Sequence, residues 1–196
     1  QFIEYLNQQV FNGYTLVLVD HGQKKTGIKD SEKIKVIFSD VNGWAKAVNV
    51  GLRYVLNQDL QDDDCVLIIN DDVVLREDYL KKVNDIVKEK PKSIVGSCCI
   101  DKRNNKILRA SIVLNKYKAL YIYHYQGLDA SVLSSDYIES DVLTGKGTII
   151  PINILKEIGI YEEEKLPHYK ADHELVLRAK KRGFDVIVAP ELKVYT

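Results

Sequence analysis

Three polar side chains stand together directly after an apolar run. Residues 66–69 are Val-Leu-Ile-Ile, and Asn70, Asp71 and Asp72 follow them. Ligands of open α/β sheets bind outside the carboxyl ends of the strands, where such residues would lie. Carboxylate oxygens suit hard cations such as Mg2+ or Mn2+, and a cation of this kind can neutralise a diphosphate. The triplet also fits a plain strand-to-helix turn, with Asp72 near a helix start that favours carboxylates.

A second acid follows a β-rich run near the start of the chain. Residues 15–19 are Thr-Leu-Val-Leu-Val, and Asp20 comes next, before His21 and Gly22. A carboxylate at this place can accept hydrogen bonds from a ribose or a base. The alternative is an ordinary turn residue, because Asp side chains commonly hydrogen-bond to nearby backbone in turns.

Two glycines interrupt a strand-like pattern that covers residues 142–151. They are Gly145 and Gly147, in the segment Thr-Gly-Lys-Gly-Thr at residues 144–148. Glycine inside a strand pattern indicates a bulge or a close approach of another group to the backbone. The spacing differs from that of a Walker phosphate-binding loop.

An amide lies within an apolar stripe of helical spacing. The stripe runs from Trp44 to Leu56 and contains Asn49 and Gly51. Small residues on one helix face permit close approach to a sheet or to a ligand. Plain helix packing explains the apolar positions, but a buried amide such as Asn49 needs hydrogen-bond partners.

Asp172 stands at the predicted first turn of another amphipathic helix, close to His168 and His173. Three structural explanations are available for it: an N-cap, a carboxylate that interacts with the helix dipole, or a surface charge.

The elements that would position these residues alternate between short apolar runs and helical periodicities, which is the pattern of an α/β sheet. Strands are predicted over 15–19, 33–38, 65–69, 93–100, 107–114, 121–125, 142–151 and 185–189, and helices over 1–11, 44–56, 79–87, 153–159 and 172–182. A doubly wound domain usually opens with a strand. We therefore expect a single domain over residues 1–196 that lacks its first strand and a C-terminal extension.

Composition narrows the class of protein. The chain has 196 residues, and Lys plus Arg and Asp plus Glu both number 28, so the formal net charge is zero. That balance argues against a nucleic-acid binder, which normally has a basic excess. No apolar run approaches the ~20 residues that span a bilayer. The cysteines Cys65, Cys98 and Cys99 lack metal-ligand spacing and indicate buried thiols in a reducing compartment.

Taken in order, these segments resemble family 2 glycosyltransferases. The closest resemblance is to a bacterial branch with a tryptophan at a helix entry, an Asn-Asp-Asp strand end, a Thr-Gly-x-Gly-Thr loop and a Pro-His-Tyr-x-Ala-Asp segment. Here these are Trp44, residues 70–72, residues 144–148 and residues 167–172. The resemblance covers nearly the whole chain. It implies the GT-A fold, an α/β domain with a mainly parallel sheet flanked by helices.

The resemblance also implies roles for single residues. Asp20 would contact the donor nucleoside, Asp72 would ligate a divalent cation, Mg2+ or Mn2+, with Asp71 nearby, and Asp172 would be the catalytic base. We assign Asp71, Asn49 and Gly145 to donor binding as well. The chain departs from the family after Asp20-His21-Gly22, where the family commonly has Ser and a second Asp and this chain has Gln-Lys-Lys.

The implied activity is inverting transfer of a sugar from a nucleotide-diphosphate donor to a glycan or lipid-linked acceptor, in cell-surface polysaccharide or glycan synthesis. A cytoplasmic location, peripheral at the inner face of the membrane, would suit it. Two alternatives remain at this stage. One is a metal-dependent nucleotidyltransferase or phosphohydrolase that uses Asp71 and Asp72, and the other is a non-catalytic module that binds nucleotide sugars.

Overall fold

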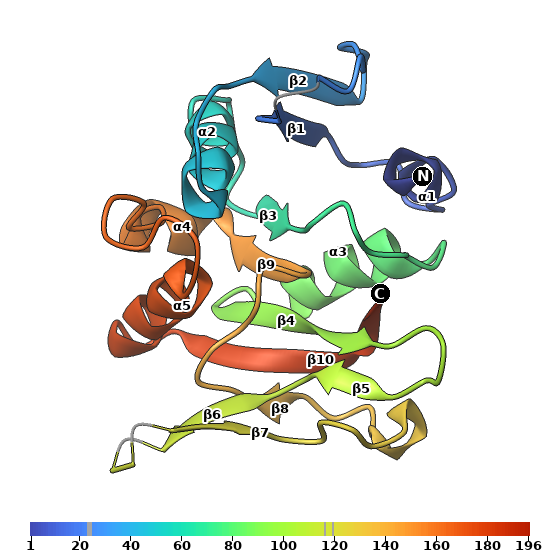
Figure 1. The fold of residues 1–196 in the computed structure, drawn as a ribbon, viewed down its shortest axis with the longest axis vertical. Coiled ribbons are helices and arrows are strands. Elements are labelled where there is room, and N and C mark those ends of the chain that lie inside the picture. The colour runs from blue at the N-terminus through green and yellow to red at the C-terminus, as the bar shows by residue number, and fades with distance from the viewer. Residues whose placement is uncertain (23–24, 116, 119) are drawn as a thin grey trace.

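A six-stranded mixed sheet forms the centre of the molecule (Figure 1). The structure is a computed structural model that describes residues 1–22, 25–115, 117–118 and 120–196. The strand order is β3 (Cys65–Ile68), β9 (Thr148–Pro151), β4 (Ser93–Ile100), β10 (Asp185–Tyr195) and β8 (Ile138–Glu139), and β5 (Ile107–Arg109) also pairs with β4. The sequence-based prediction of an α/β fold with helices around a sheet is confirmed.

The strand directions correct the expectation of a mainly parallel sheet. β4 and β10 pair in parallel, whereas β9 is antiparallel to both of its neighbours, β3 and β4. β5 and β8 are also antiparallel to the strands that they pair with. Strands β3, β4 and β10 therefore run in one direction, and the reversed β9 lies between β3 and β4. Hydrophobic runs do not reveal strand direction, so the sequence could not predict that an antiparallel strand lies between β3 and β4.

Strand β4 is buried on both faces, which explains its continuous apolar sequence. Alternate residues of β4 point to opposite sides of the sheet. Ile94, Cys98 and Ile100 belong to one core cluster, and Val95 and Cys99 belong to the other. The sheet is thus the middle layer between two hydrophobic cores.

Helices cover the two faces unequally (Figure 1). One core contains buried residues of α2 (Trp44–Leu56), α4 (Ile152–Ile158) and α5 (Ala171–Lys181). The other contains those of α1 (Phe2–Asn7) and α3 (Tyr79–Glu89). None of the helices in the described ranges is long and apolar enough to cross a membrane.

Two smaller sheets flank the central one at opposite ends of the molecule (Figure 1). β1 (Leu16–Asp20) pairs in parallel with β2 (Ile34–Phe38), and helix α2 packs against β1. β6 (Ile112–Asn115) and β7 (Leu120–Tyr123) form an antiparallel hairpin. A short 3-10 helix, η1 (Ala130–Val132), lies between β7 and β8.

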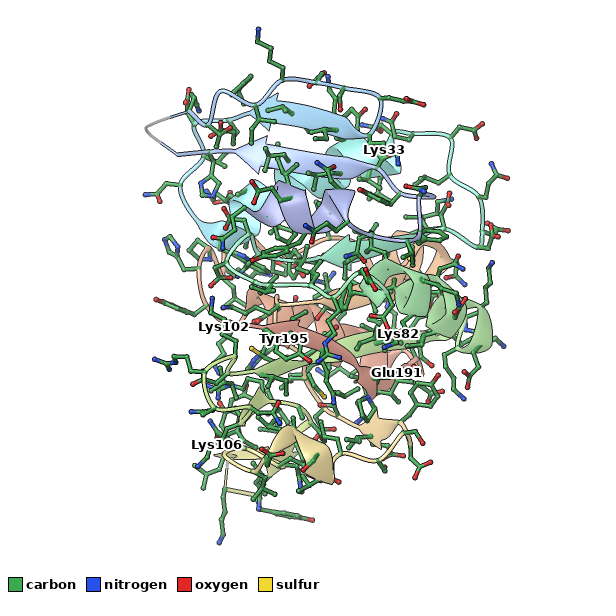
Figure 2. All side chains as sticks on the ribbon, turned by 90° about the vertical axis from the view of Figure 1, so that its right-hand side faces the viewer. Lys33, Lys82, Lys102, Lys106, Glu191 and Tyr195 are labelled. Atoms are coloured by element: carbon green, nitrogen blue, oxygen red, sulfur yellow. The ribbon has the colours of Figure 1, made fainter. Side chains whose placement is uncertain are left out.

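Most predicted elements are present within a few residues of their expected bounds. The strand predicted at 142–151 is confined to Thr148–Pro151, and the helix predicted at 1–11 ends at Asn7. The run predicted at 107–114 is split into β5 and β6. The strand predicted to end at Ala189 continues to Tyr195, through a register shift between Ala189 and Lys193. This irregularity accommodates Pro190, which has no N–H to donate to a sheet. Beyond it, Tyr195 forms a bridge with Val74, and Figure 2 labels its ring.

Candidate active site

The glycine-containing loop at residues 144–148 leads into β9. It contacts the end of β3 and the first turns of α2 and α5. The Gly147 N–H donates to the carbonyl oxygen of Ile68, at the end of β3, over 3.0 Å. Gly147 has a φ of +87°, and a Cβ at this position would lie 2.6 Å from Ser97 Oγ. A Cβ on Gly145 would lie 2.4 Å from Trp44 Cζ2. Both glycines therefore permit a close approach that another residue would prevent.

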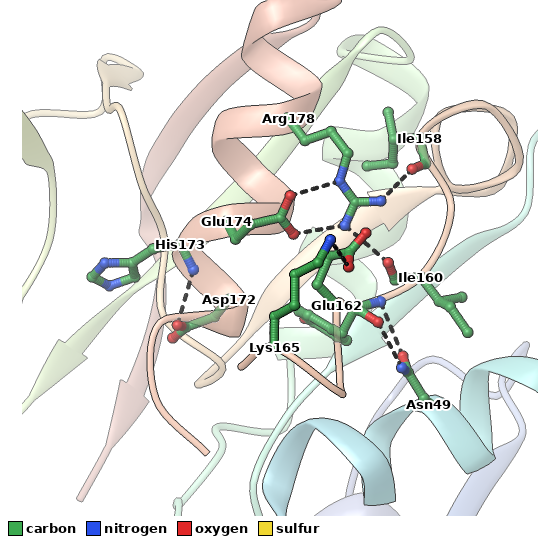
Figure 3. A network of polar contacts seen from close by, with 10 residues as sticks. Asn49, Ile158, Ile160, Glu162, Lys165, Asp172, His173, Glu174 and Arg178 are labelled. Atoms are coloured by element: carbon green, nitrogen blue, oxygen red, sulfur yellow. Dashed lines mark hydrogen bonds and ion pairs between the residues drawn. The ribbon is translucent and has the colours of Figure 1, made fainter. Parts of the chain in front are cut away.

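Asp172 lies in the first turn of α5 and contacts this loop. Its Oδ2 accepts a hydrogen bond from the Gly145 N–H over 3.3 Å, and its Oδ1 accepts one from the His173 N–H over 2.9 Å. Figure 3 shows the carboxylate at the beginning of the helix. Lys170 precedes the helix with a φ of +69°, an uncommon conformation for a residue other than glycine. Helix α5 thus begins directly after a left-handed residue, and its second residue, Asp172, contacts the glycine loop.

The neighbour of Gly145 in the loop contacts the second acidic site. Lys146 Nζ lies 2.6 Å from Asp72 Oδ2. Asp72 is in the turn after β3, and its side chain is 59% exposed, whereas that of Lys146 is 28% exposed. Asp71 is exposed in the same turn. In the described part of the chain, no group of three or more His, Cys, Asp or Glu side chains is arranged to hold a metal ion.

Trp44 fixes the position of the strand end before Asp71. It is the first residue of α2, and its Nε1–H donates to Asn70 Oδ1 over 3.1 Å. The Trp44 ring meets Tyr161 edge to face, with ring centroids 5.3 Å apart. Burial, and then the charge of Asp172, raise the pKa of Tyr161. Trp44 therefore packs between the Asn70 turn and the segment that leads to the candidate base.

Asp20 is the last residue of β1, as predicted, and its side chain is buried. The Asp20 Oδ2 accepts hydrogen bonds from the Thr26 N–H at 2.8 Å and from the Thr26 hydroxyl at 2.9 Å. The Thr26 backbone hydrogen bond is the largest influence that lowers the pKa of Asp20, so the group stays ionised at neutral pH. Gln23 and Lys24, where the chain departs from the family pattern, lie outside the described residues.

An open cavity of about 510 Å3 lies beside the residues that follow Thr26. Phe38, which pairs with Asp20 in the register of β1 and β2, is 58% exposed at its edge. The cavity is lined by Gly27, Ile28, Lys29, Asp30, Val36 and Phe38.

Asn49 lies on the buried face of α2, within the predicted apolar stripe. Its side chain is 0% exposed, and its amide both donates to the Tyr161 carbonyl at 2.9 Å and accepts from the Tyr161 N–H at 3.0 Å. The amide also donates to Glu163 Oε2. These protein partners satisfy the buried amide without a ligand, and donor binding by Asn49 stays a prediction. Asn49 attaches helix α2 to the segment between α4 and α5.

Arg178 attaches the same segment to α5, a role that was not predicted. Its guanidinium donates to Glu174 at 3.0 and 2.7 Å and to the backbone oxygens of Ile158 and Ile160 (Figure 3). The spacing of Glu174 and Arg178, four residues apart on a predicted helix, was the available signal. The Arg178 guanidinium thus holds the Glu174 carboxylate in an ion pair, whereas Asp172 is the acid of this turn that contacts the glycine loop.

Comparisons with solved structures identify the same architecture. The crystal structure of GalNAc-T7 with UDP, GalNAc and Mn2+ superposes with a TM-score of 0.74 at 12% identity, over 98% of this chain and 40% of that one. S. aureus TarS 1-349 superposes with a TM-score of 0.62 at 16% identity, over 99% of this chain and 55% of that one. The same TarS fragment in complex with UDP-GlcNAc gives a TM-score of 0.60 at 16% identity, over 99% of this chain and 53% of that one.

These similarities show a shared fold, and the chain spans about half or less of each neighbour. No curated protein matches the sequence. The family model described as "Glycosyltransferase like family 2" matches residues 12–196, which include Asp20, Asp72 and Asp172. The chain therefore has the GT-A fold and belongs to glycosyltransferase-like family 2.

Proposed function

We propose that the chain transfers a sugar from a nucleotide-diphosphate donor to an acceptor hydroxyl, with inversion at the anomeric carbon. One observation carries the proposal. Consecutive residues of one loop contact the two acids that such a reaction needs: the Gly145 N–H donates to Asp172, and the Lys146 ammonium pairs with Asp72. A base for the acceptor and an acid beside the donor diphosphate are therefore held by one short segment.

Asp172 is proposed as the general base. In a single displacement the acceptor oxygen forms a bond to the anomeric carbon while the bond from that carbon to the diphosphate oxygen breaks. The acceptor proton passes to the Asp172 carboxylate, and the nucleotide diphosphate leaves with the bonding electrons. General-base assistance of this kind contributes about 10²–10⁴-fold. No covalent intermediate with the protein is required.

Asp72 and Asp71 are proposed to hold a divalent cation together with the donor. Their oxygen donors fit Mg2+ or Mn2+, and Mg2+ sites commonly use only one or two carboxylates plus substrate phosphates. This explains how the site could serve a cation without a larger cluster of protein ligands. GalNAc-T7, which has the same fold, was crystallised with UDP and Mn2+. When bound, such a cation supplies Lewis-acid stabilisation of the departing diphosphate.

The nucleoside is proposed to bind at the end of β1. The ionised Asp20 and the open cavity next to Phe38 offer a hydrogen-bond acceptor and an exposed aromatic face. UDP is the first nucleotide to test, because two structural neighbours were crystallised with UDP or UDP-GlcNAc. We propose a glycan or lipid-linked acceptor and a cytoplasmic setting, which suits the free, buried Cys98 and Cys99.

Binding and turnover measurements test the proposal. We expect calorimetry to detect UDP binding that tightens in Mn2+, and we expect nucleotide-sugar donors to release nucleoside diphosphate and free or transferred sugar. Release of a sugar phosphate or of inorganic phosphate would instead favour the nucleotidyltransferase or phosphohydrolase alternative. Binding without any turnover across donors and acceptors would favour a non-catalytic module.

A further inference from the structure

Lys146 is partly buried, and the backbone on both sides of it is hydrogen-bonded. The residues on either side of it donate backbone hydrogen bonds to fixed partners, Gly145 to Asp172 and Gly147 to Ile68. Its side chain is 28% exposed and ends 2.6 Å from Asp72. An ion pair between segments 74 residues apart cannot result from helical spacing, unlike the pair of Lys82 with Asp78 on α3.

Asp72 and Lys146 carry opposite charges, and each would act on a diphosphate bound beside them. Asp72 is the residue proposed to face the donor diphosphate through a cation, yet without one its carboxylate would repel the phosphates. Lys146 neutralises that carboxylate in the structure. An ammonium is also a direct ligand for phosphate oxygens, and hydrogen bonds between charged groups are stronger than neutral ones.

We propose that Lys146 is a binding residue for the donor diphosphate, held by Asp72 until a nucleotide enters. This inference rests on the proposed function and extends it. Lys146 supplies a positive charge of the protein itself, so nucleotide binding persists in part without a divalent cation. A cation held by Asp72 would leave the Lys146 ammonium free for the phosphates, so that cation and lysine would act on the same ligand.

Titrations with UDP and with uridine, each in EDTA and in Mn2+, test the role of Lys146. We expect wild-type protein to bind UDP measurably in EDTA. Lys146→Met should weaken that binding at least ~10-fold, the low end for losing a charge-assisted hydrogen bond. Uridine has no phosphate, so its affinity should not change. Lys146→Arg, which keeps the charge, should retain most of the UDP affinity and serves if the Met variant does not fold.

Two further variants sharpen the test. Lys82→Met removes a lysine whose ion pair with Asp78 has a similar length of 2.7 Å, on helix α3 (Figure 2), and should leave UDP affinity unchanged. Asp72→Asn frees Lys146 and removes a negative charge. It should tighten UDP binding in EDTA by about 2–5-fold, the value of an exposed ion pair that no longer has to be broken. The same variant should lose the response to Mn2+.

The possible failures are distinguishable. If wild-type protein binds UDP in Mn2+ but Lys146→Met binds it equally well under both conditions, the lysine is a structural partner of Asp72 and only this inference is wrong. The inference is equally wrong if wild-type protein binds UDP in Mn2+ but not in EDTA, or if uridine and UDP lose affinity to the same extent. If wild-type protein binds UDP under neither condition, the proposed nucleotide site itself is absent.

Discussion

Replacing Asp172 by Asn distinguishes a catalytic base from a residue that only holds the start of α5 against the glycine loop. The carboxylate accepts two hydrogen bonds, one from the His173 N–H at 2.9 Å and one from the Gly145 N–H at 3.3 Å. An Asn amide has a single acceptor oxygen and an NH2 group that only donates. The variant can therefore keep one of the two contacts. It must place its NH2 group against the other N–H.

The two roles predict losses of different size. Losing one backbone hydrogen bond costs about 0.5–1.5 kcal/mol of the free energy of unfolding. Losing a general base lowers the rate by at least ~10²-fold, which corresponds to about 2.7 kcal/mol in the activation free energy. If Asp172 is the base, the loss of transfer exceeds the loss of stability. Donor affinity should be nearly unchanged, because the carboxylate acts on the acceptor proton.

The assay combines single-turnover sugar transfer, UDP titration and urea unfolding for each variant. Asp129→Asn is a matched control, because Asp129 caps the 3-10 helix η1 by accepting a hydrogen bond from the Ser131 N–H at 2.9 Å. That substitution should cost similar stability and leave transfer unchanged. The loss of a general base is expected to lower the rate of transfer by ~10²-fold. If Asp172→Asn transfers sugar within ~3-fold of the wild-type rate, Asp172 has only a structural role. His168, which is exposed, would then be the next candidate, since Glu174 is paired with Arg178.

Three further predictions follow from single contacts. Asp72→Ala should abolish the Mn2+-dependent part of UDP binding without changing the melting temperature, because the side chain is 59% exposed; an unchanged Mn2+ response in calorimetry would exclude its role. Asn49→Ala should cost about 1–3 kcal/mol in urea unfolding, because the Tyr161 N–H is left buried without an acceptor. Loss of UDP affinity at wild-type stability would contradict the structural role of Asn49. Asp101 has a pKa lowered to about 2, chiefly by its hydrogen bonds with Arg103, below the ordinary 3.8. Its folded pKa is depressed, so it stabilises the fold above pH 3.8, and this contribution is lost as pH falls through about 2. Asp101→Asn should therefore reduce the acid-induced loss of stability between these values, and an unchanged acid unfolding curve would count against it.

The sequence was sufficient for features that depend on local pattern. Strand β4 was predicted at its observed bounds, because a run buried on both faces is continuously apolar. Asp20 was expected at a strand end and is the last residue of β1. The start of α5 was also expected near Asp172. In each case the signal lies within about ten consecutive residues, and hydrophobic period and turn chemistry act over that length.

Features that depend on pairing between distant segments were not predictable in this way. The reversed strand β9 carries the same apolar residues that a parallel strand would carry, so its direction was missed. Asn49 was known only to need partners. Its actual partners are on Tyr161 and Glu163, more than a hundred positions away, and a ligand would have satisfied the same amide. The sequence therefore could not distinguish an amide that bonds to distant backbone from one that binds a ligand.

The role proposed for Lys146 follows from its position in the fold and could not be predicted from the loop pattern. In the sequence Lys146 is the x position of the Thr-Gly-x-Gly-Thr pattern, for which the pattern specifies no side chain. In the fold, Gly145 is tied to Asp172, Gly147 is tied to the end of β3, and the only side chain between them must project toward Asp72. Any change in the turn after β3 therefore acts on Lys146 and Gly145 together. One short covalent segment therefore joins the diphosphate side and the acceptor side of the proposed reaction.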